Sequence, residues 1–152
     1  MQVTVIGLGY IGLPTAALLA SRGFQVSGVD INPHVVEKVN AGQSHIVEPG
    51  LEELISAGVK SGNLKAYTEL QKADTYLIIV PTPFIHENKA PDMSYVRKAS
   101  EQLAEILKEG DMVILESTSS VGSTRKDVQE VVESVRPELK AKIDYAFCPE
   151  RA

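Results

Sequence analysis

The order of segments near the start of the sequence constrains the fold more than any other feature. These segments are an apolar run, three glycines, an alanine- and leucine-rich stretch, a second apolar run and an acid: residues 3–6, Gly7, Gly9 and Gly12, residues 13–20, residues 25–29, and Asp30. Apolar runs bounded by glycine indicate strands, and the stretch between them is long enough for a helix. The order therefore predicts a strand, a tight turn, a helix and a second strand, which together form a βαβ unit.

The three glycines match the spacing of a dinucleotide-binding turn, in which each has its own role. Gly7 permits the tight turn, Gly9 lets the backbone approach a pyrophosphate, and Gly12 lets the helix pack closely on the strand. The free N–H groups of the helix N-terminus then face the phosphates. We predict that these glycines contact a dinucleotide together with Tyr10 and Ile11, although the sequence does not decide where the Tyr10 ring packs.

Asp30 lies 18 residues after Gly12, close to the ~20 expected for an acid that binds the adenosine ribose hydroxyls. A carboxylate repels a 2′-phosphate, so Asp30 favours NAD over NADP. The alternative is a tight turn without a ligand. Asp30 argues against that alternative, since an acid at a strand end is expected to contribute little to packing.

Length and charge exclude several classes of protein. The 152 residues suit one domain, residues 1–152, and the net charge of −5 gives no basic surface for nucleic acid or an anionic membrane. No apolar run approaches the length of a membrane span, and a strand that starts at residue 2 leaves no room for a signal peptide. Cys148 is the only cysteine, so no internal disulfide is expected and we predict a cytoplasmic protein.

Strands and helices alternate through the rest of the chain. Strands are expected at residues 3–6, 25–29, 64–68, 75–80, 112–115 and 143–147, helices at 13–20, 33–41, 50–59, from 92 or 94 to Gly110, and from 122 or 123 to the residue before Pro137, and polar loops at 43–49, 84–91 and 116–120. This alternation predicts an α/β, Rossmann-type doubly wound parallel sheet of about six strands with helices on both faces. The expected strand order is 3-2-1-4-5-6.

Three strand ends on the predicted ligand-binding edge have unusual residues. They are residues 81–83 (Pro-Thr-Pro), 117–120 (Ser-Thr-Ser-Ser) and 148–151 (Cys-Pro-Glu-Arg). Ligands of such sheets bind outside the carboxyl ends of the strands. We therefore expect these segments to lie near the dinucleotide.

Five motifs together carry a resemblance to a known family. They are Gly-Leu-Gly-Tyr-Ile-Gly-Leu-Pro (7–14), Glu-Pro-Gly-Leu (48–51), Val-Pro-Thr-Pro (80–83), Glu-Ser-Thr (116–118) with Val-Gly-Ser (121–123), and Cys-Pro-Glu-Arg (148–151). In this order they resemble the N-terminal domain of the UDP-glucose/GDP-mannose dehydrogenase family. The resemblance covers the whole chain and implies a domain that binds NAD.

The resemblance also implies a reaction and a set of roles. The family oxidises the C6 alcohol of a UDP-sugar to a carboxylate with two NAD, through an aldehyde and a cysteine thioester, as a step in polysaccharide biosynthesis. Thr118 matches the threonine that holds a catalytic water, and Glu150 the glutamate associated with thioester hydrolysis. The nicotinamide half of NAD is expected to contact Pro81, Thr82, Pro83, Ser117 and Thr118.

The family's nucleophilic cysteine, with the lysine and asparagine that assist it, lies in a segment after this domain. We therefore expect the 152 residues to be part of a longer chain and, alone, to bind NAD without turning over. Within the family, four stretches resemble the branch that acts on UDP-N-acetyl-D-mannosamine: residues 45–49, 81–84, 91–96 and 114–118. They resemble the UDP-glucose branch less, which makes UDP-glucose the alternative substrate.

Other residues admit a structural explanation beside a functional one. We expect Cys148 to be a half-buried structural cysteine rather than a nucleophile. Thr118 could cap the following helix, and Glu150 could be a solvated acid rather than a general base. The three histidines show no spacing typical of a metal site, so none is predicted.

Two other classes of protein remain as alternatives. One is an NAD-sensing module without catalysis, and the other is a relative of the β-hydroxyacid dehydrogenases, against which the strand ends at 81–83 and 116–118 argue. A homodimer is possible, but family members associate largely through the segment that follows this domain.

Overall fold

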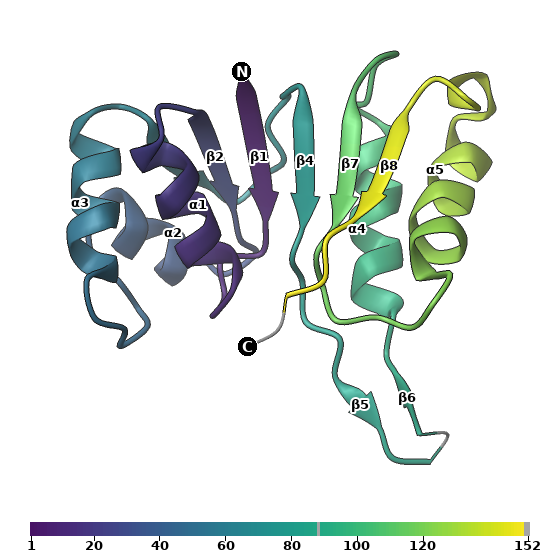
Figure 1. Ribbon diagram of the computed structural model, residues 1–152, viewed down its shortest axis with the longest axis horizontal. Helices are drawn as coiled ribbons and strands as arrows, with labels where there is room; N and C mark the ends of the chain where they lie inside the picture. Colours follow the sequence, from purple (N-terminus) through teal and green to yellow (C-terminus); the bar gives the residue numbers. More distant parts are fainter. Residues whose placement is uncertain (88, 151–152) are drawn as a thin grey trace.

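The computed structural model describes residues 1–87 and 89–150 and shows a parallel sheet flanked by helices (Figure 1). Within these residues the sheet has six strands in the order β3-β2-β1-β4-β7-β8, and all neighbouring pairs run parallel. The strands are β1 Gln2–Ile6, β2 Gln25–Val29, β3 Leu64–Tyr67, β4 Thr75–Ile78, β7 Met112–Leu115 and β8 Asp144–Phe147. This is the predicted strand order, and the predicted fold class is confirmed.

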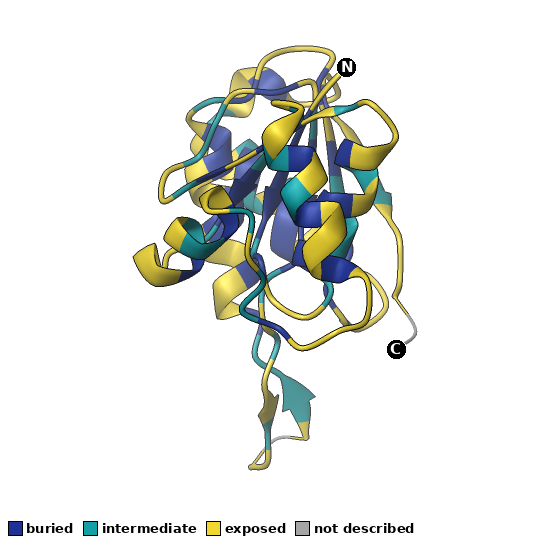
Figure 2. Cartoon of the chain, turned by 90° about the vertical axis from the view of Figure 1, so that its left-hand side faces the viewer, coloured by how far each residue is buried: buried dark blue, intermediate teal, exposed yellow. Residues whose placement is uncertain are grey.

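Helices cover both faces of the sheet because alternate side chains of the central strands enter two different apolar cores. In β1, Val5 packs in one core and Ile6 in the other, and in β4 Leu77 and Ile78 divide in the same way. The first core includes α1 Gly12–Ser21, α2 Pro33–Asn40 and α3 Leu51–Lys60, and the second includes α4 Ser94–Ala104 and α5 Glu130–Val135. The buried residues form a continuous band along the strands (Figure 2).

The small residues of α1 let this helix lie close to its neighbours. Ala16, Ala17 and Ala20 are buried, and α1 packs against α3. A Cβ added at Gly58 of α3 would come within 3.3 Å of Ala20 Cβ and 3.1 Å of Leu64 Cβ. This close packing holds the C-terminal part of α1 against α3 and the start of β3.

Residues 84–91 are a hairpin rather than the predicted polar loop, with Asn88 lying outside the described residues. Strand β5 Phe84–Ile85 pairs antiparallel with β6 Ala90–Pro91. The hairpin extends away from the domain beyond the carboxyl ends of the parallel strands (Figures 1 and 2). Phe84 and Ile85 favour strand conformation, and the Phe84 ring meets the His86 ring edge-on at 5.3 Å between centroids.

Helix α4 ends at Ala104, earlier than the predicted end at Gly110. The buried carboxylate of Asp111 accepts a hydrogen bond from the backbone N–H of Lys108 at 2.9 Å and pairs with the Lys108 ammonium group. Because the N–H of Lys108 is bound by this side chain, it is not available to continue the helix. The prediction of a longer helix is therefore wrong.

The helix that was predicted to run up to Pro137 is α-helical only in its second part. It begins as a π-helix, η1 Thr124–Gln129, continues as α5, and is followed by a short 3₁₀ turn, η2 Pro137–Leu139. A π turn accommodates one residue more than an α turn and so changes where side chains point. Here the buried carboxylate of Asp127 accepts a hydrogen bond from Arg97 Nε of α4 at 2.7 Å.

Candidate functional site

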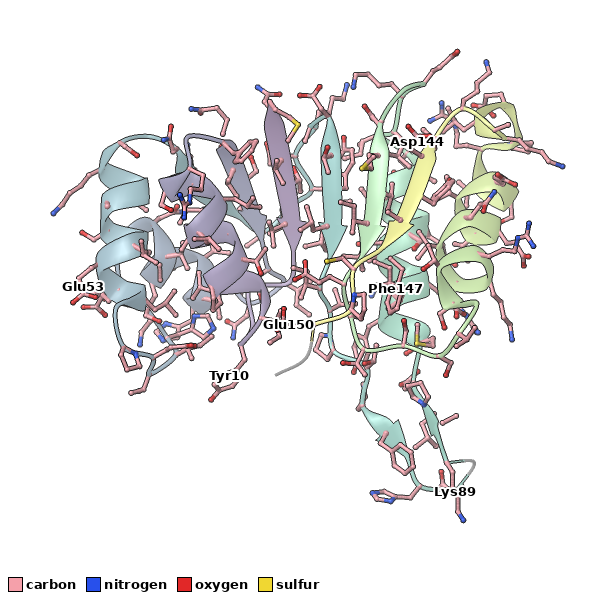
Figure 3. The ribbon with its side chains drawn as sticks, viewed as in Figure 1. Tyr10, Glu53, Lys89, Asp144, Phe147 and Glu150 are labelled. Carbon is pink, nitrogen blue, oxygen red and sulfur yellow. The ribbon has the colours of Figure 1, made fainter. Side chains whose placement is uncertain are left out.

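A cleft lies at the carboxyl end of β1, where the direction of the chain across the sheet reverses. From β1 the chain crosses through α1 to β2, whereas from β4 it crosses through α4 to β7 on the opposite side. Ligands of open parallel sheets bind at such a switch point. The cleft has a volume of about 630 Å³, and Tyr10 and Glu150 lie on this edge of the sheet (Figure 3).

The cleft brings together most of the residues predicted to bind the cofactor. Those that line it are Gly7, Gly9, Tyr10, Ile11, Asp30, Pro81, Thr82, Ser117 and Thr118. Gly12 and Pro83 are not among the lining residues that the structure describes. Gly12 is buried beneath the turn, and Pro83 is exposed at the start of the hairpin, where its carbonyl accepts a hydrogen bond from Asp92 N at 2.7 Å.

The glycine turn requires two glycines for its own packing. Gly7 has φ +97°, and an added Cβ would lie 2.2 Å from the carbonyl oxygen of Ile79. A Cβ on Gly12 would lie 1.8 Å from the carbonyl oxygen of Gly7. Both contacts are with backbone atoms, so a side chain at either position would force the turn apart.

Gly9 differs from Gly7 and Gly12, because the packing of the protein does not require a glycine at this position. An added Cβ at Gly9 would meet no described atom within 4 Å. Within residues 1–87 and 89–150, no side-chain hydrogen bond caps the N-terminus of α1, and the first turn of the helix contains no acid. Uncapped N–H groups at a helix N-terminus are a binding site for an anion. The open space over Gly9 and the helix end beside it therefore fit a pyrophosphate.

Asp30 lines the cleft at the end of β2 and also supports the glycine turn. Its carboxylate accepts hydrogen bonds from Leu8 N at 3.0 Å and from Asn32 N at 2.9 Å. The expectation that an acid here contributes little to packing is wrong, since the first bond joins the turn to β2. Asn32 caps α2 by accepting a hydrogen bond from His34 N at 3.0 Å.

The loops after β4 and β7 form the opposite wall, and two hydroxyl groups join them. Ser117 Oγ donates a hydrogen bond to the carbonyl oxygen of Val80 at 2.8 Å. Thr82 Oγ1 donates to the carbonyl oxygen of Thr118 at 2.7 Å. These side chains therefore position the cleft wall in addition to any contact with a ligand.

Glu116 lines the cleft and was not predicted as a site residue. Glu116 is 7% exposed and comes directly after the apolar strand β7. Burial raises the pKa of the Glu116 carboxyl, repulsion from Glu150 raises it further, and a hydrogen bond with Thr15 acts in the opposite direction. An acid that follows a buried strand at the ligand-binding edge is the signal in the sequence that could have identified it.

Glu150 follows β8 and lines both the cleft and an adjoining groove. Tyr10 also lines both, and Glu48 lines the groove. Glu150 and Thr118, the two predicted catalytic residues, are exposed and lie on the wall of the same cleft. The arrangement thus brings a hydroxyl and a carboxylate to the side of the cleft opposite Asp30.

Three further expectations concern residues outside the cleft. Cys148 is exposed rather than half-buried, and its N–H donates to the carbonyl oxygen of Leu115 at 3.0 Å. Among residues 1–87 and 89–150, no three His, Cys, Asp or Glu side chains gather as a metal site would require. Over the same residues, no helix has the length and apolar character needed to cross a membrane.

The fold and the cleft define a dinucleotide-binding domain of the Rossmann type. Residues 1–152 match the NAD-binding domain of the UDP-glucose/GDP-mannose dehydrogenase family, and the chain belongs to that family. The match favours this family over the β-hydroxyacid dehydrogenases, which were the other family considered from the sequence. It also confirms NAD as the cofactor.

Relatives with known names agree with this assignment. The NDP-N-acetyl-D-galactosaminuronic acid dehydrogenase of Ralstonia nicotianae and the UDP-N-acetyl-D-mannosamine dehydrogenase of Escherichia coli (strain K12) are each 50% identical to this chain over 98% of its length. The solved structure of the UDP-N-acetyl-mannosamine dehydrogenase Cap5O from Staphylococcus aureus matches 100% of the chain with a TM-score of 0.93 and 38% identity. The chain spans 37% of the length of each of these proteins.

Proposed function

We propose that this chain is the NAD-binding part of a UDP-sugar 6-dehydrogenase. The observation that carries the proposal is the cleft, which offers a carboxylate at one end, an open glycine and a helix N-terminus in the middle, and hydroxyl groups at the other end. NAD would place its adenosine ribose on Asp30, its pyrophosphate over Gly9, and its nicotinamide between Thr82 and the Ser117–Thr118 segment.

The proposed reaction removes two hydrides from the C6 alcohol, one to each of two NAD molecules. One water supplies the second oxygen of the carboxylate, and three protons are released for each sugar. In this proposal Thr118 holds the catalytic water and Glu150 takes its proton as the thioester is hydrolysed. Their exposure on one wall of the cleft supports both roles, because each group can reach a substrate placed beside the nicotinamide.

We propose UDP-N-acetyl-D-mannosamine as the substrate, on the four stretches that resemble that branch of the family. The Escherichia coli relative and the Cap5O structure carry this name. The Ralstonia relative is equally identical and is named for an N-acetyl-D-galactosaminuronic acid. The corresponding N-acetylgalactosamine nucleotide is therefore the second candidate, ahead of UDP-glucose.

Binding of NAD to the 152-residue chain is the first test. Isothermal titration calorimetry with NAD and NADP should show binding of NAD and much weaker binding of NADP, because Asp30 would face the 2′-phosphate of NADP. The Asp30→Lys variant should lose this preference. A folded chain that binds neither nucleotide would refute the proposal.

Turnover tests the reaction and separates the alternatives. The complete product of the gene should form two NADH per UDP-N-acetyl-D-mannosamine, and faster than with the galactosamine or glucose nucleotide. The 152 residues alone should bind NAD without steady NADH formation, since Cys148 does not occupy the position of the family's nucleophile. A complete product that binds NAD but oxidises no UDP-sugar would favour the NAD-sensing module. A homodimer and a cytoplasmic location stay predictions, which light scattering and cell fractionation would test.

A further inference from the structure

The cleft offers no cationic side chain to a pyrophosphate among its described lining residues. Among the lining residues that the structure describes, three are acids, Asp30, Glu116 and Glu150, and none is lysine, arginine or histidine. The pyrophosphate would therefore depend on backbone N–H groups and the helix dipole. Any further negative charge on the ligand would meet repulsion without a compensating cation from these residues.

The acids are divided between the two ends of the cleft. Asp30 follows β2, on one side of β1, and Glu116 follows β7, on the other side. Glu150 follows β8 and is the charged group whose repulsion acts on Glu116. Because the adenosine end lies at Asp30, Glu116 and Glu150 belong to the nicotinamide end.

We propose that Glu116, with Glu150 beside it, makes the cleft select oxidised NAD⁺ over reduced NADH. The inference rests on the proposed function. The two cofactors have nearly the same size and the same pyrophosphate, and they differ by one positive charge on the nicotinamide ring. Repulsion of the phosphates, desolvation and ordering are therefore common to both and cancel in the ratio of their dissociation constants. What remains is the attraction of a carboxylate for the cationic ring.

This selection suits a reaction that uses two NAD molecules in succession. After the first hydride transfer, the ring loses its charge and with it the attraction to Glu116. NADH is then released more readily, and a second NAD⁺ takes its place. The same carboxylate would thus favour binding before each transfer and release after it.

The selection should depend on pH through the charge of Glu116. The groups that act on Glu116 are the Thr15 hydroxyl on α1 and Glu150 after β8, while Tyr10 and Asp30 line the same cleft. Burial and Glu150 keep the Glu116 carboxyl protonated to a higher pH than a free glutamate, despite the Thr15 hydrogen bond. Selection for NAD⁺ should therefore be weak in acid and increase as the pH rises and Glu116 ionises.

The test compares two dissociation constants on the 152-residue chain. Calorimetry gives the value for NAD⁺, and NADH fluorescence, excited at wavelengths that protein side chains do not absorb, gives the value for NADH. In Glu116→Gln the ratio Kd(NADH)/Kd(NAD⁺) should fall about tenfold, the effect of one unit charge near a partly solvated ring. The control is Glu53→Gln, the same change on α3 away from the cleft (Figure 3), which should leave the ratio unchanged.

A pH series provides an independent readout that a purely structural role would not change. In the unmodified chain the ratio should increase as the pH is raised from acid to neutral, and in Glu116→Gln the increase should be much smaller, because only Glu150 then remains at this end of the cleft. A folded Glu116→Gln variant with an unchanged ratio would overturn the inference. If that variant does not fold, a flat pH series in the unmodified chain would overturn it. If neither cofactor binds, the proposed function fails, and this inference fails with it.

Discussion

Two glycine-to-alanine variants in one turn should have opposite consequences. Gly9→Ala adds a Cβ that meets no described atom within 4 Å, whereas Gly12→Ala adds one 1.8 Å from the carbonyl oxygen of Gly7. The variants differ by three positions and are chemically identical. They therefore separate the part of the motif that the fold requires from the part that the cofactor requires.

Gly12→Ala should destabilise the protein. The overlap is with backbone, which cannot rotate away, so the turn or helix α1 must shift. Overpacking of this kind costs about 1–3 kcal/mol and sometimes more. For a domain of this size, a loss of about 3 kcal/mol lowers Tm by roughly 6–12 °C.

Gly9→Ala should leave stability nearly unchanged and weaken binding. Replacing a glycine at a compatible backbone conformation changes the free energy of unfolding by less than about 1 kcal/mol. The new methyl group would occupy the space proposed for the pyrophosphate and separate it from the backbone N–H groups. Loss of one charge-assisted hydrogen bond costs about 2 kcal/mol, or a roughly thirtyfold higher Kd for NAD.

The assay pairs urea denaturation with calorimetric titration of NAD. Circular dichroism reports unfolding, since the chain contains no tryptophan for intrinsic fluorescence. Equal NAD affinity in Gly9→Ala and the unmodified chain would refute the placement of the pyrophosphate over Gly9. A loss of stability in Gly9→Ala as large as that in Gly12→Ala would refute the distinction between the two glycines.

Three further variants test single contacts. Asp30→Asn keeps an oxygen for the Leu8 N–H but removes the charge, so Kd(NADP)/Kd(NAD) should fall about tenfold in parallel calorimetric titrations; an unchanged ratio would contradict the role of the charge. Arg97→Ala leaves the Asp127 carboxylate, whose side chain is 4% exposed, without its cation; because the Arg97 side chain is itself 49% exposed, the loss in urea denaturation should be about 1–3 kcal/mol, with Arg97→Lys as the milder control. Burial, with repulsion from Glu133, raises the pKa of Tyr145 from its ordinary value of 10.0 to about 12. Between these values the unfolded chain ionises the hydroxyl while the folded chain keeps it neutral, so stability falls as pH rises through this interval. Tyr145→Phe should reduce that fall when unfolding is compared at pH 9 and pH 11, and an equal fall would show that other groups cause it.

The sheet could be predicted from the sequence because its signals are local. Apolar runs that begin two residues after a glycine predicted β2 and β7 with the bounds that the structure has, and short connections allowed few strand orders. The ends of α4 and the π-helix η1 could not be predicted in this way. They depend on buried carboxylates, Asp111 and Asp127, and periodicity does not show which acids are buried or with what they pair.

The residues of the glycine turn could be predicted because a sequence motif fixes their backbone conformation. Site residues whose role depends on contacts between distant parts of the chain were missed. Glu116 was missed because its partners, Thr15 and Glu150, come from the first helix and the end of the described chain. Cys148 was expected to be half-buried because cysteine is usually a buried residue. Since β8 is the edge of the sheet, a residue after it has a neighbouring strand on one side only, and Cys148 is exposed.

The walls of the cleft are held by bonds within the protein, and this determines how the binding experiments can be interpreted. The Asp30 carboxylate joins the glycine turn to β2, while Thr82 and Ser117 join the loops after β4 and β7. Ordering a mobile loop would cost about 1–2 kcal/mol per residue, and this cost would enter every dissociation constant. Because the loops are already joined to each other, NAD has little to order. A weaker Kd in Gly9→Ala, or a changed ratio in Glu116→Gln, would therefore report a lost contact or a lost charge rather than a wall that no longer forms.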